Sequence, residues 1–253
     1  STIATNISGY QFLTMMGSAY YFGLAQANLE INAVQGLLLA TFIFVPLSLR
    51  QKVITVTQFL KTRLGPWVAM AYSVGNILLF ATVGLGAALF LGAYAADFVL
   101  SDYLDPWTTD RNVRIGAMVI FFGMFSAVYT YFGGLTAVVR TDIIQFAILL
   151  AGGLILLFVS IDALGGWGKL YEAPLRAKMH LHLPADHPKL PWTAAGAWFL
   201  LNINYWCANQ SVMQRSLAAR SLRDAQIGLL AGGIMKYVMA ILVVVPGIAL
   251  FGI

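Results

Sequence analysis

The sequence predicts an all-α integral membrane protein with about seven transmembrane helices. Of the 253 residues, 60% are hydrophobic and only 10% are charged, whereas a soluble domain carries roughly 25% charged residues. The apolar residues form runs that reach the roughly 20 residues needed for one helical crossing of a bilayer. The net charge of +5 comes from short connecting loops, and the aromatic residues lie in apolar runs. This pattern favours membrane topology over nucleic-acid binding.

The first two expected crossings differ in continuity. The second, at about 30–49, is a nearly unbroken apolar run headed by Glu30. The first, at about 3–25, is typical of a discontinuous helix, because polar and small residues interrupt it. The interrupting residues are Asn6, Ser8, Gly9, Tyr10 and Gln11. The segment 50–65 that follows the second crossing has basic but no acidic residues, so we expect it on the cytoplasmic side.

The middle of the chain predicts three more crossings. The third, at about 66–100, is long enough to tilt, and aspartates between 102 and 110 mark an outside loop after it. The fourth, at about 113–131, turns at Gly133 and Gly134 into the fifth, at about 141–161. The loop at 162–191 mixes glycine, proline and both charges, which predicts partly ordered surface structure.

The sixth crossing, 192–215, is apolar at its ends and polar in its middle. Its polar residues there are Asn202, Asn204, Tyr205, Asn209 and Gln210. An unpaired amide in hydrocarbon is costly, so such groups normally face a protein-lined or water-filled cavity. We interpret the stretch as a discontinuous helix that forms a binding site at mid-membrane, as in secondary transporters. The alternative is a packed helix whose amides bond to neighbouring helices.

The seventh crossing begins near residue 225 and continues to the end of the chain. The loops after the second, fourth and sixth crossings hold most of the basic residues, which orients the first crossing from inside to outside. The chain begins with Ser1 and ends within an apolar run, so we expect a piece of a longer protein. Cys207 is the only cysteine, which excludes an internal disulfide and a cysteine-based metal site.

Two opposite charges lie at membrane depth. Glu30 heads the second crossing, and Lys236 lies within the seventh between apolar neighbours. Ionisable groups at such depth are costly unless paired or hydrated, so we expect the two to pair with each other or through a substrate. The alternatives are an interfacial position for Glu30 and extension of Lys236 to the membrane surface.

Two similar dipeptides, Asn6-Ile7 and Asn202-Ile203, break apolar helices five crossings apart. This spacing is a weak sign of an inverted repeat.

Several stretches resemble one family of membrane carriers. They are Asn6-Ile7-Ser8 through Gln11-Phe12, ITVTQFLKTRLG, YFGGLTAVVRTDIIQ, LPADHPKLPW, and NINYWCANQSVMQRSLAAR followed by Lys236 and PGIA. The chain is similar over essentially its whole length to sodium/solute symporters of the sodium/glucose cotransporter type. The resemblance implies a LeuT-type inverted-repeat transporter fold in which helices 1 and 6 are discontinuous. The first five-helix repeat would cover 1–161, an extracellular loop 162–191, and the first two helices of the second repeat 192–253.

The resemblance also implies roles for individual residues. Gln11, Glu30, Asn202 and Lys236 correspond to residues that bind substrate. Tyr205 corresponds to the aromatic residue that stacks under the sugar as the inner gate, and Asn6 to a residue that holds this gate. The carbonyls of Ala4 and Ile7 correspond to part of the sodium site, and Asp142 to a carboxylate on the exit path of the ion. Hydrogen-bonding groups around an aromatic surface suit a pyranose ring.

Two departures from the family pattern limit this comparison. Leu29 and Ile31 flank Glu30 where sugar carriers often have aromatic residues. The eighth helix, which completes the sodium site, and the tenth, which supplies another sugar contact, are not in this sequence.

The implied function is a sodium-coupled symporter that takes up a sugar or polyol by alternating access, with sodium as the coupling ion and no enzymatic activity. Alternatives are a sodium symporter for a carboxylate, amino acid or vitamin, and a non-transporting membrane sensor with the same core. We expect a multi-pass protein of the plasma (inner) membrane that does not bind nucleic acid. The histidines at 180, 182 and 187 do not form a convincing metal site, and the GxxxG at 228–232 indicates helix packing.

Overall fold

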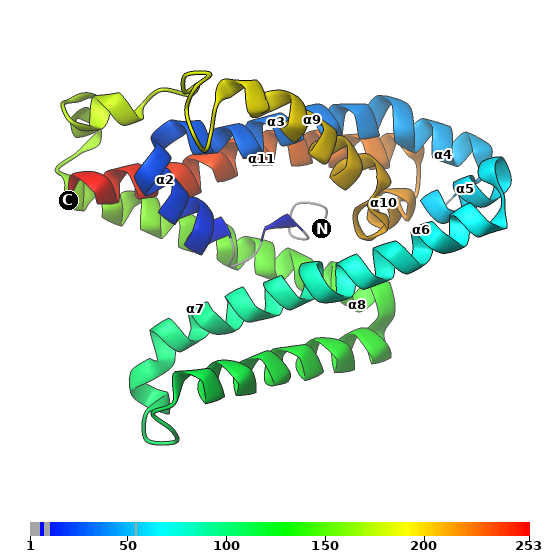
Figure 1. Cartoon of the computed structure of the whole chain (residues 1–253), viewed down its shortest axis with the longest axis horizontal. Coiled ribbons are helices and arrows are strands. Elements are labelled where there is room, and N and C mark those ends of the chain that lie inside the picture. Colours follow the sequence, from blue (N-terminus) through cyan, green and yellow to red (C-terminus); the bar gives the residue numbers. More distant parts are fainter. Residues whose placement is uncertain (1–5, 8–10, 54) are drawn as a thin grey trace.

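The computed structural model describes residues 6–7, 11–53 and 55–253. Their regular secondary structure is helical (Figure 1), apart from an isolated bridge between Leu183 and Pro191. Within the described residues, four helical segments are long and apolar enough to cross a membrane, namely Phe12–Gln51, Pro66–Leu104, Arg111–Leu164 and Leu222–Gly252. The chain is therefore built as a multi-pass membrane protein.

The first of these segments contains two antiparallel arms. A π-helical turn at Gln11–Met15 leads into α2 (Met16–Phe22), and α3 (Asn28–Leu39) and α4 (Val45–Gln51) form the returning arm. The chain reverses after Gly23, whose φ of 64° suits glycine. A Cβ there would lie 2.2 Å from the carbonyl oxygen of Lys178, so the loop after the fifth crossing packs directly on this turn.

Ile7 lies outside any helix. The expected interruption of the first crossing extends over residues 8–10, which lie outside the described part of the chain, as does Ala4.

A hairpin of long apolar helices follows. The short α5 (Val56–Leu64) leads into α6 (Pro66–Leu79) and α7 (Gly86–Leu104). The helix α8 (Arg111–Leu164) then breaks at Gly134, where φ is 55° and ψ is −156°. Its two arms correspond to the expected fourth and fifth crossings. The third crossing extends to Leu104, beyond the expected end near 100, so Asp102 is helical.

The sixth crossing is divided into two helices. A 3-10 turn at Trp192–Ala194 leads into α9 (Ala195–Ile203), and α10 (Gln210–Leu217) follows a π-helical turn at Asn204–Ala208. Asn209 between them is extended, with φ −69° and ψ 121°. The discontinuity expected from the polar residues is therefore present in this helix.

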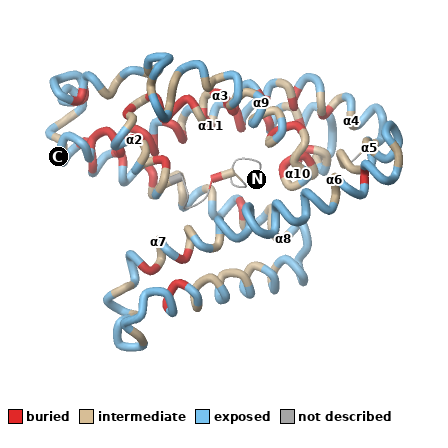
Figure 2. Tube along the Cα trace, in the orientation of Figure 1, coloured by how far each residue is buried: buried red, intermediate tan, exposed pale blue. Residues whose placement is uncertain are grey.

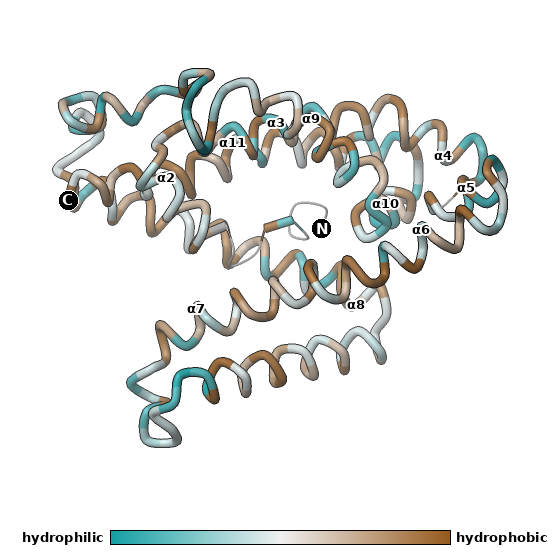
Figure 3. The backbone as a smooth tube through the Cα atoms, in the orientation of Figure 1, coloured by the Kyte–Doolittle hydropathy of each residue, from teal (hydrophilic) through white to brown (hydrophobic). Residues whose placement is uncertain are grey.

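The last helix, α11 (Leu222–Gly252), is the centre of the packing. It contacts α2, α3 and α8, and α3 also packs against α9. Figure 2 shows buried residues concentrated along these helices. Together α6, α7 and the first arm of α8, residues 66–133, form an outer hairpin that is mostly exposed and strongly hydrophobic (Figure 3).

Candidate functional site

A buried ion pair joins the first, second and seventh crossings. Lys236 on α11 is 2% exposed, and its Nζ lies 2.5 Å from Oε2 of Glu30 on α3. Nζ also donates a hydrogen bond to Oδ1 of Asn6. Of the two pairings that the sequence predicted, direct or through a substrate, the direct one is present. Lys236 is therefore a buried, paired residue and does not extend to the surface. Breaking a buried pair leaves an uncompensated charge, which is costly. The pair therefore stabilises the contact between α3 and α11.

An aromatic side chain covers this ion pair. Trp206 is 1% exposed, and the centroid of its ring lies 5.3 Å from Nζ of Lys236. Its indole Nε1 donates to Oδ1 of Asn202 at 3.2 Å, and Nδ2 of Asn202 donates to the carbonyl of Trp198 at 2.9 Å. Sequence reasoning did not single out Trp206. The signal available was its position one helical turn after Asn202, next to Tyr205.

Tyr205 lies beside the same cluster. Its ring meets that of Trp206 edge to face, with centroids 5.0 Å apart. Its side chain interacts with that of Asn6, the residue that also accepts from Lys236. The structure thus brings Asn6, Glu30, Tyr205 and Lys236 together, with Asn202 linked to them through Trp206. Nothing is described for the side chain of Gln11.

The break in the sixth helix has its own stabilising contacts. Oδ1 of Asn209 accepts from the backbone N of Ser211 at 2.9 Å and from its Oγ at 2.7 Å. Asn209 therefore caps the N-terminus of α10, a typical role for asparagine. Its backbone N donates to the carbonyl of Asn204 at 2.9 Å, which closes the wide turn. The side-chain amide of Asn209 therefore stabilises the break between α9 and α10.

The second and sixth crossings approach closely at Gly36. A Cβ at this position would lie 2.7 Å from the carbonyl oxygen of Asn202 and 2.9 Å from the ring of Trp206. On the other side of the contact, Sγ of Cys207 donates to the carbonyl of Gly36 at 3.4 Å. Glycine is required here because only a residue without a side chain lets α3 and α9 pack this tightly. This position was not predicted from the sequence.

A second buried pair lies at the other end of the broken helix. Asp142 in the second arm of α8 and Arg215 in α10 are joined with Oδ2 and Nε 3.3 Å apart, and both side chains are less than a tenth exposed. Arg215 also donates to the carbonyl of Ser211. The pair ties the fifth crossing to the second half of the sixth. Any ion that uses Asp142 must share it with this arginine.

A third polar cluster, missed in the sequence, closes the tip of the outer hairpin. Asp97 in α7 is 2% exposed and accepts from Nε of Arg114 at 2.7 Å and from Nε of Arg111 at 3.0 Å. Arg114 also bonds Asp105 at 2.5 Å. Both arginines belong to the first turn of α8, which begins at Arg111, two residues before the expected start of the fourth crossing. An acid inside the third crossing was the signal that sequence reasoning overlooked.

The loop at 162–191 contains short 3-10 turns, Trp167–Tyr171 and Leu175–Lys178. Nζ of Lys178 donates to the carbonyls of Tyr20 and Tyr21 at the end of α2. The ring of His187 packs edge to face on Phe22, with centroids 5.9 Å apart. The loop therefore contains the partly ordered surface structure that its composition predicted. Its packing over the turn at Gly23 was not predicted.

Comparison with known proteins gives one consistent family. The model of the sodium:solute symporter family matches residues 1–253. A sodium/glucose cotransporter of Vibrio parahaemolyticus is 32% identical over 99% of this chain and 46% of its own length. A sodium/mannose cotransporter of Bos taurus is 31% identical over 88% of this chain and 39% of its own length. A sodium/myo-inositol cotransporter of Oryctolagus cuniculus is 28% identical over 98% of this chain and 38% of its own length. The chain thus spans less than half the length of these relatives.

Proposed function

Because the chain belongs to the sodium:solute symporter family, we propose that it forms the substrate-binding core of a sodium-coupled symporter for a sugar or polyol. The relatives named for glucose, mannose and myo-inositol support a polyhydroxylated solute. The proposal includes alternating access within a LeuT-type inverted repeat, with residues 1–161 as the first repeat and 192–253 as the start of the second. It also places the protein in the plasma membrane.

The observation that carries the proposal is the buried ion pair between Lys236 and Glu30. A hydroxyl group both donates and accepts hydrogen bonds, so a sugar hydroxyl can accept from the ammonium while another donates to the carboxylate. The charges of Lys236 and Glu30 neutralise each other, and binding of a neutral solute leaves the net charge of the site at zero. A substrate anion would instead compete with Glu30 for Lys236 and leave excess negative charge in a buried place, which is costly.

The surrounding groups suit the same solute. Trp206 and Tyr205 supply aromatic surface beside the pair, and the C–H face of a pyranose packs well on such surfaces. Tyr205, held by Asn6, serves as the gate. Asn6 contacts both the gate and Lys236, so a solute that engages Lys236 also alters the support of Tyr205.

Sodium is the second substrate in this proposal. Hard cations prefer oxygen ligands, and unwound transporter helices offer backbone carbonyls for this purpose. The carbonyls of Ala4 and Ile7 would contribute, and Ile7 lies outside any helix. Asp142 would receive the ion on its exit path by exchanging its contact with Arg215 for one with sodium.

Uptake of radiolabelled glucose and myo-inositol by the full-length protein in proteoliposomes tests this function. We expect accumulation with an inward sodium gradient and its loss when potassium replaces sodium. Lys236→Gln and Glu30→Gln should abolish uptake, whereas Lys169→Gln in the outer loop, whose side chain is 51% exposed, should retain it. Wild-type uptake in both site variants would overturn the site assignment.

Two other results would identify the alternatives. Uptake that is blocked by organic anions and unaffected by neutral sugars would replace the sugar with a carboxylate. Sodium-dependent sugar binding without any uptake in the full-length protein would indicate a sensor.

A further inference from the structure

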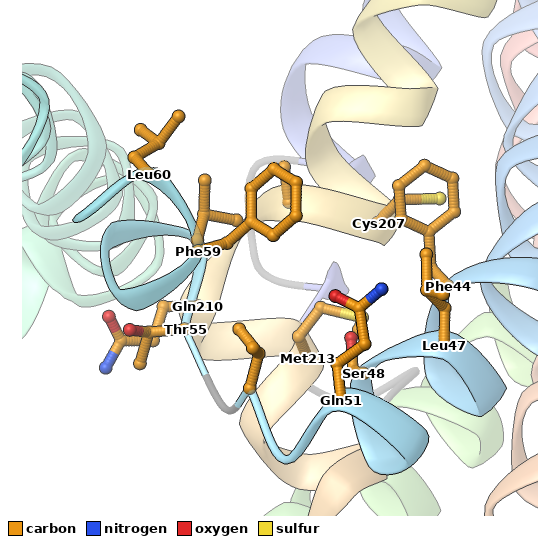
Figure 4. A pocket seen from close by; sticks show the side chains of 13 residues that line it. Phe44, Leu47, Ser48, Gln51, Thr55, Phe59, Leu60, Cys207, Gln210 and Met213 are labelled. Carbon is orange, nitrogen blue, oxygen red and sulfur yellow. The ribbon is translucent and has the colours of Figure 1, made fainter. Parts of the chain in front are cut away.

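An apolar cavity lies apart from the ion pair, between α4, α5 and the break in the sixth helix. Its volume is about 280 Å³. Figure 4 shows side chains from these elements converging on it, with Leu47 from α4, Phe59 from α5 and Met213 from α10. Phe44, the last residue of the π-helical turn Ala40–Phe44 that precedes α4, also lines it. The few polar side chains around it include Gln51 and Thr55, at the ends of α4 and α5. The lining is therefore suited to a hydrocarbon group and unsuited to a sugar.

The cavity is large enough to hold a group bigger than a small side chain. An engineered apolar cavity of about 150 Å³ stays dry and binds benzene, and this one is larger. Water would find few hydrogen-bonding partners on such a lining. A flexible hydrocarbon chain from the surrounding bilayer is the most abundant apolar group that could enter.

The cavity lies at the end of α4 that leads into the basic segment 50–65, which we expect at the cytoplasmic surface of the membrane. Gln51, which lines it, is the last residue of α4, and Phe44 lies seven residues deeper. At 1.5 Å per residue the lining extends about 10 Å along the helix. This depth is the region where the first carbons of a lipid chain lie below the headgroup.

The end of the cavity at Gln51 is flanked in the sequence by basic residues, which we call its rim. Arg50 and Lys52 flank Gln51, both are exposed, and Lys61 and Arg63 follow in α5. No acidic residue occurs in the sequence between Glu30 and Asp97, so nothing nearby in the sequence neutralises these four charges. Basic segments next to transmembrane helices attract anionic lipids of the cytoplasmic leaflet. A zwitterionic lipid could fill the cavity but would gain less from the rim.

We propose that this cavity binds one acyl chain of an anionic phospholipid, whose headgroup phosphate rests on Arg50 and Lys52. The bound chain contacts Cys207, Ala208 and Gln210 at the break of the sixth helix. The lipid therefore touches the segment that links α9 to α10. The site is separate from the solute site and does not depend on the identity of the solute.

The test uses the full-length protein in nanodiscs that contain phosphatidylglycerol with a photoreactive diazirine in one acyl chain. We expect cross-links within residues 44–60 or 207–213, mapped by mass spectrometry. Unlabelled phosphatidylglycerol should compete at least tenfold better than phosphatidylcholine with the same chains. Equal competition by the two lipids would overturn the proposal.

Variants separate the chain from the headgroup. Leu47→Trp, which fills the cavity, should lower the cross-linking yield at least fivefold. Ile43→Trp should not lower it, because Ile43 is exposed on the neighbouring turn and does not line the cavity.

The double variant Arg50→Gln, Lys52→Gln should remove the preference for phosphatidylglycerol. Lys189→Gln, in the loop at 162–191, should retain this preference. Unchanged labelling in Leu47→Trp would refute the site. An absence of cross-links in both segments would show that another part of the full-length chain covers the cavity, which would also refute it.

Discussion

Removing one charge of the Lys236–Glu30 pair should destabilise the protein strongly. In Glu30→Gln, the ammonium keeps Asn6 as an acceptor but loses its counterion at 2.5 Å, while its side chain is only 2% exposed. Breaking a buried pair in this way typically costs about 3–5 kcal/mol, and we expect that loss in the free energy of unfolding of the full-length protein in detergent. Thermal and denaturant unfolding would measure it.

The double variant Glu30→Met, Lys236→Met provides the sharper test. Replacing both residues of a buried ion pair by apolar residues of similar volume is often neutral for stability, so this variant should recover most of the loss and still fail to take up sugar. Glu172→Gln breaks an exposed pair with Lys169 and should leave stability nearly unchanged. If Glu30→Gln unfolds like the wild type, or if the double variant is no more stable than the single one, the pair does not hold these helices together.

Four further predictions concern other contacts. Gly36→Ala should lower stability by about 1–3 kcal/mol through overpacking and reduce uptake, whereas Gly75→Ala, with open space around it, should be tolerated in the same assays. Asp97→Asn should lower the melting temperature by weakening the tip of the outer hairpin; an unchanged melting temperature would contradict this. Asp142→Asn should change the sodium concentration for half-maximal uptake, because it removes the proposed exit carboxylate, and unaltered sodium dependence would argue against that role. Tyr205→Ala should weaken sugar binding in equilibrium dialysis and leave sodium binding largely intact, and loss of neither would refute the gate.

Much of the candidate site could be predicted from the sequence because its residues are charged or polar within apolar segments. Glu30 and Lys236 were recognised by their charge inside apolar runs, and the pair is present. The polar middle of the sixth crossing predicted a break, and the chain leaves helical geometry at Asn209. Both inferences depend on the cost of a polar group in hydrocarbon, which holds whatever the neighbours are.

Some contacts of the site were not predicted, because they involve residues that are not charged or polar within an apolar segment. Trp206 and Gly36 carry neither a charge nor an amide side chain, and their importance depends on a neighbour on another helix. Asp97 did carry a local signal, but the sequence does not show that Arg111 and Arg114, at the start of α8, are its partners.

The amino-acid sequence by itself determined the membrane class, the approximate positions of the apolar helices and the places where a helix must be polar, because hydropathy and the cost of burying charge belong to each residue and the bilayer. Only the tertiary structure decided which residues meet. Lys236 bonds Glu30 from 206 positions away, and Arg215 bonds Asp142 from 73 positions away. Loop lengths do not set the rotation of one helix against another, so these partners follow from packing around α11 and from the close approach at Gly36.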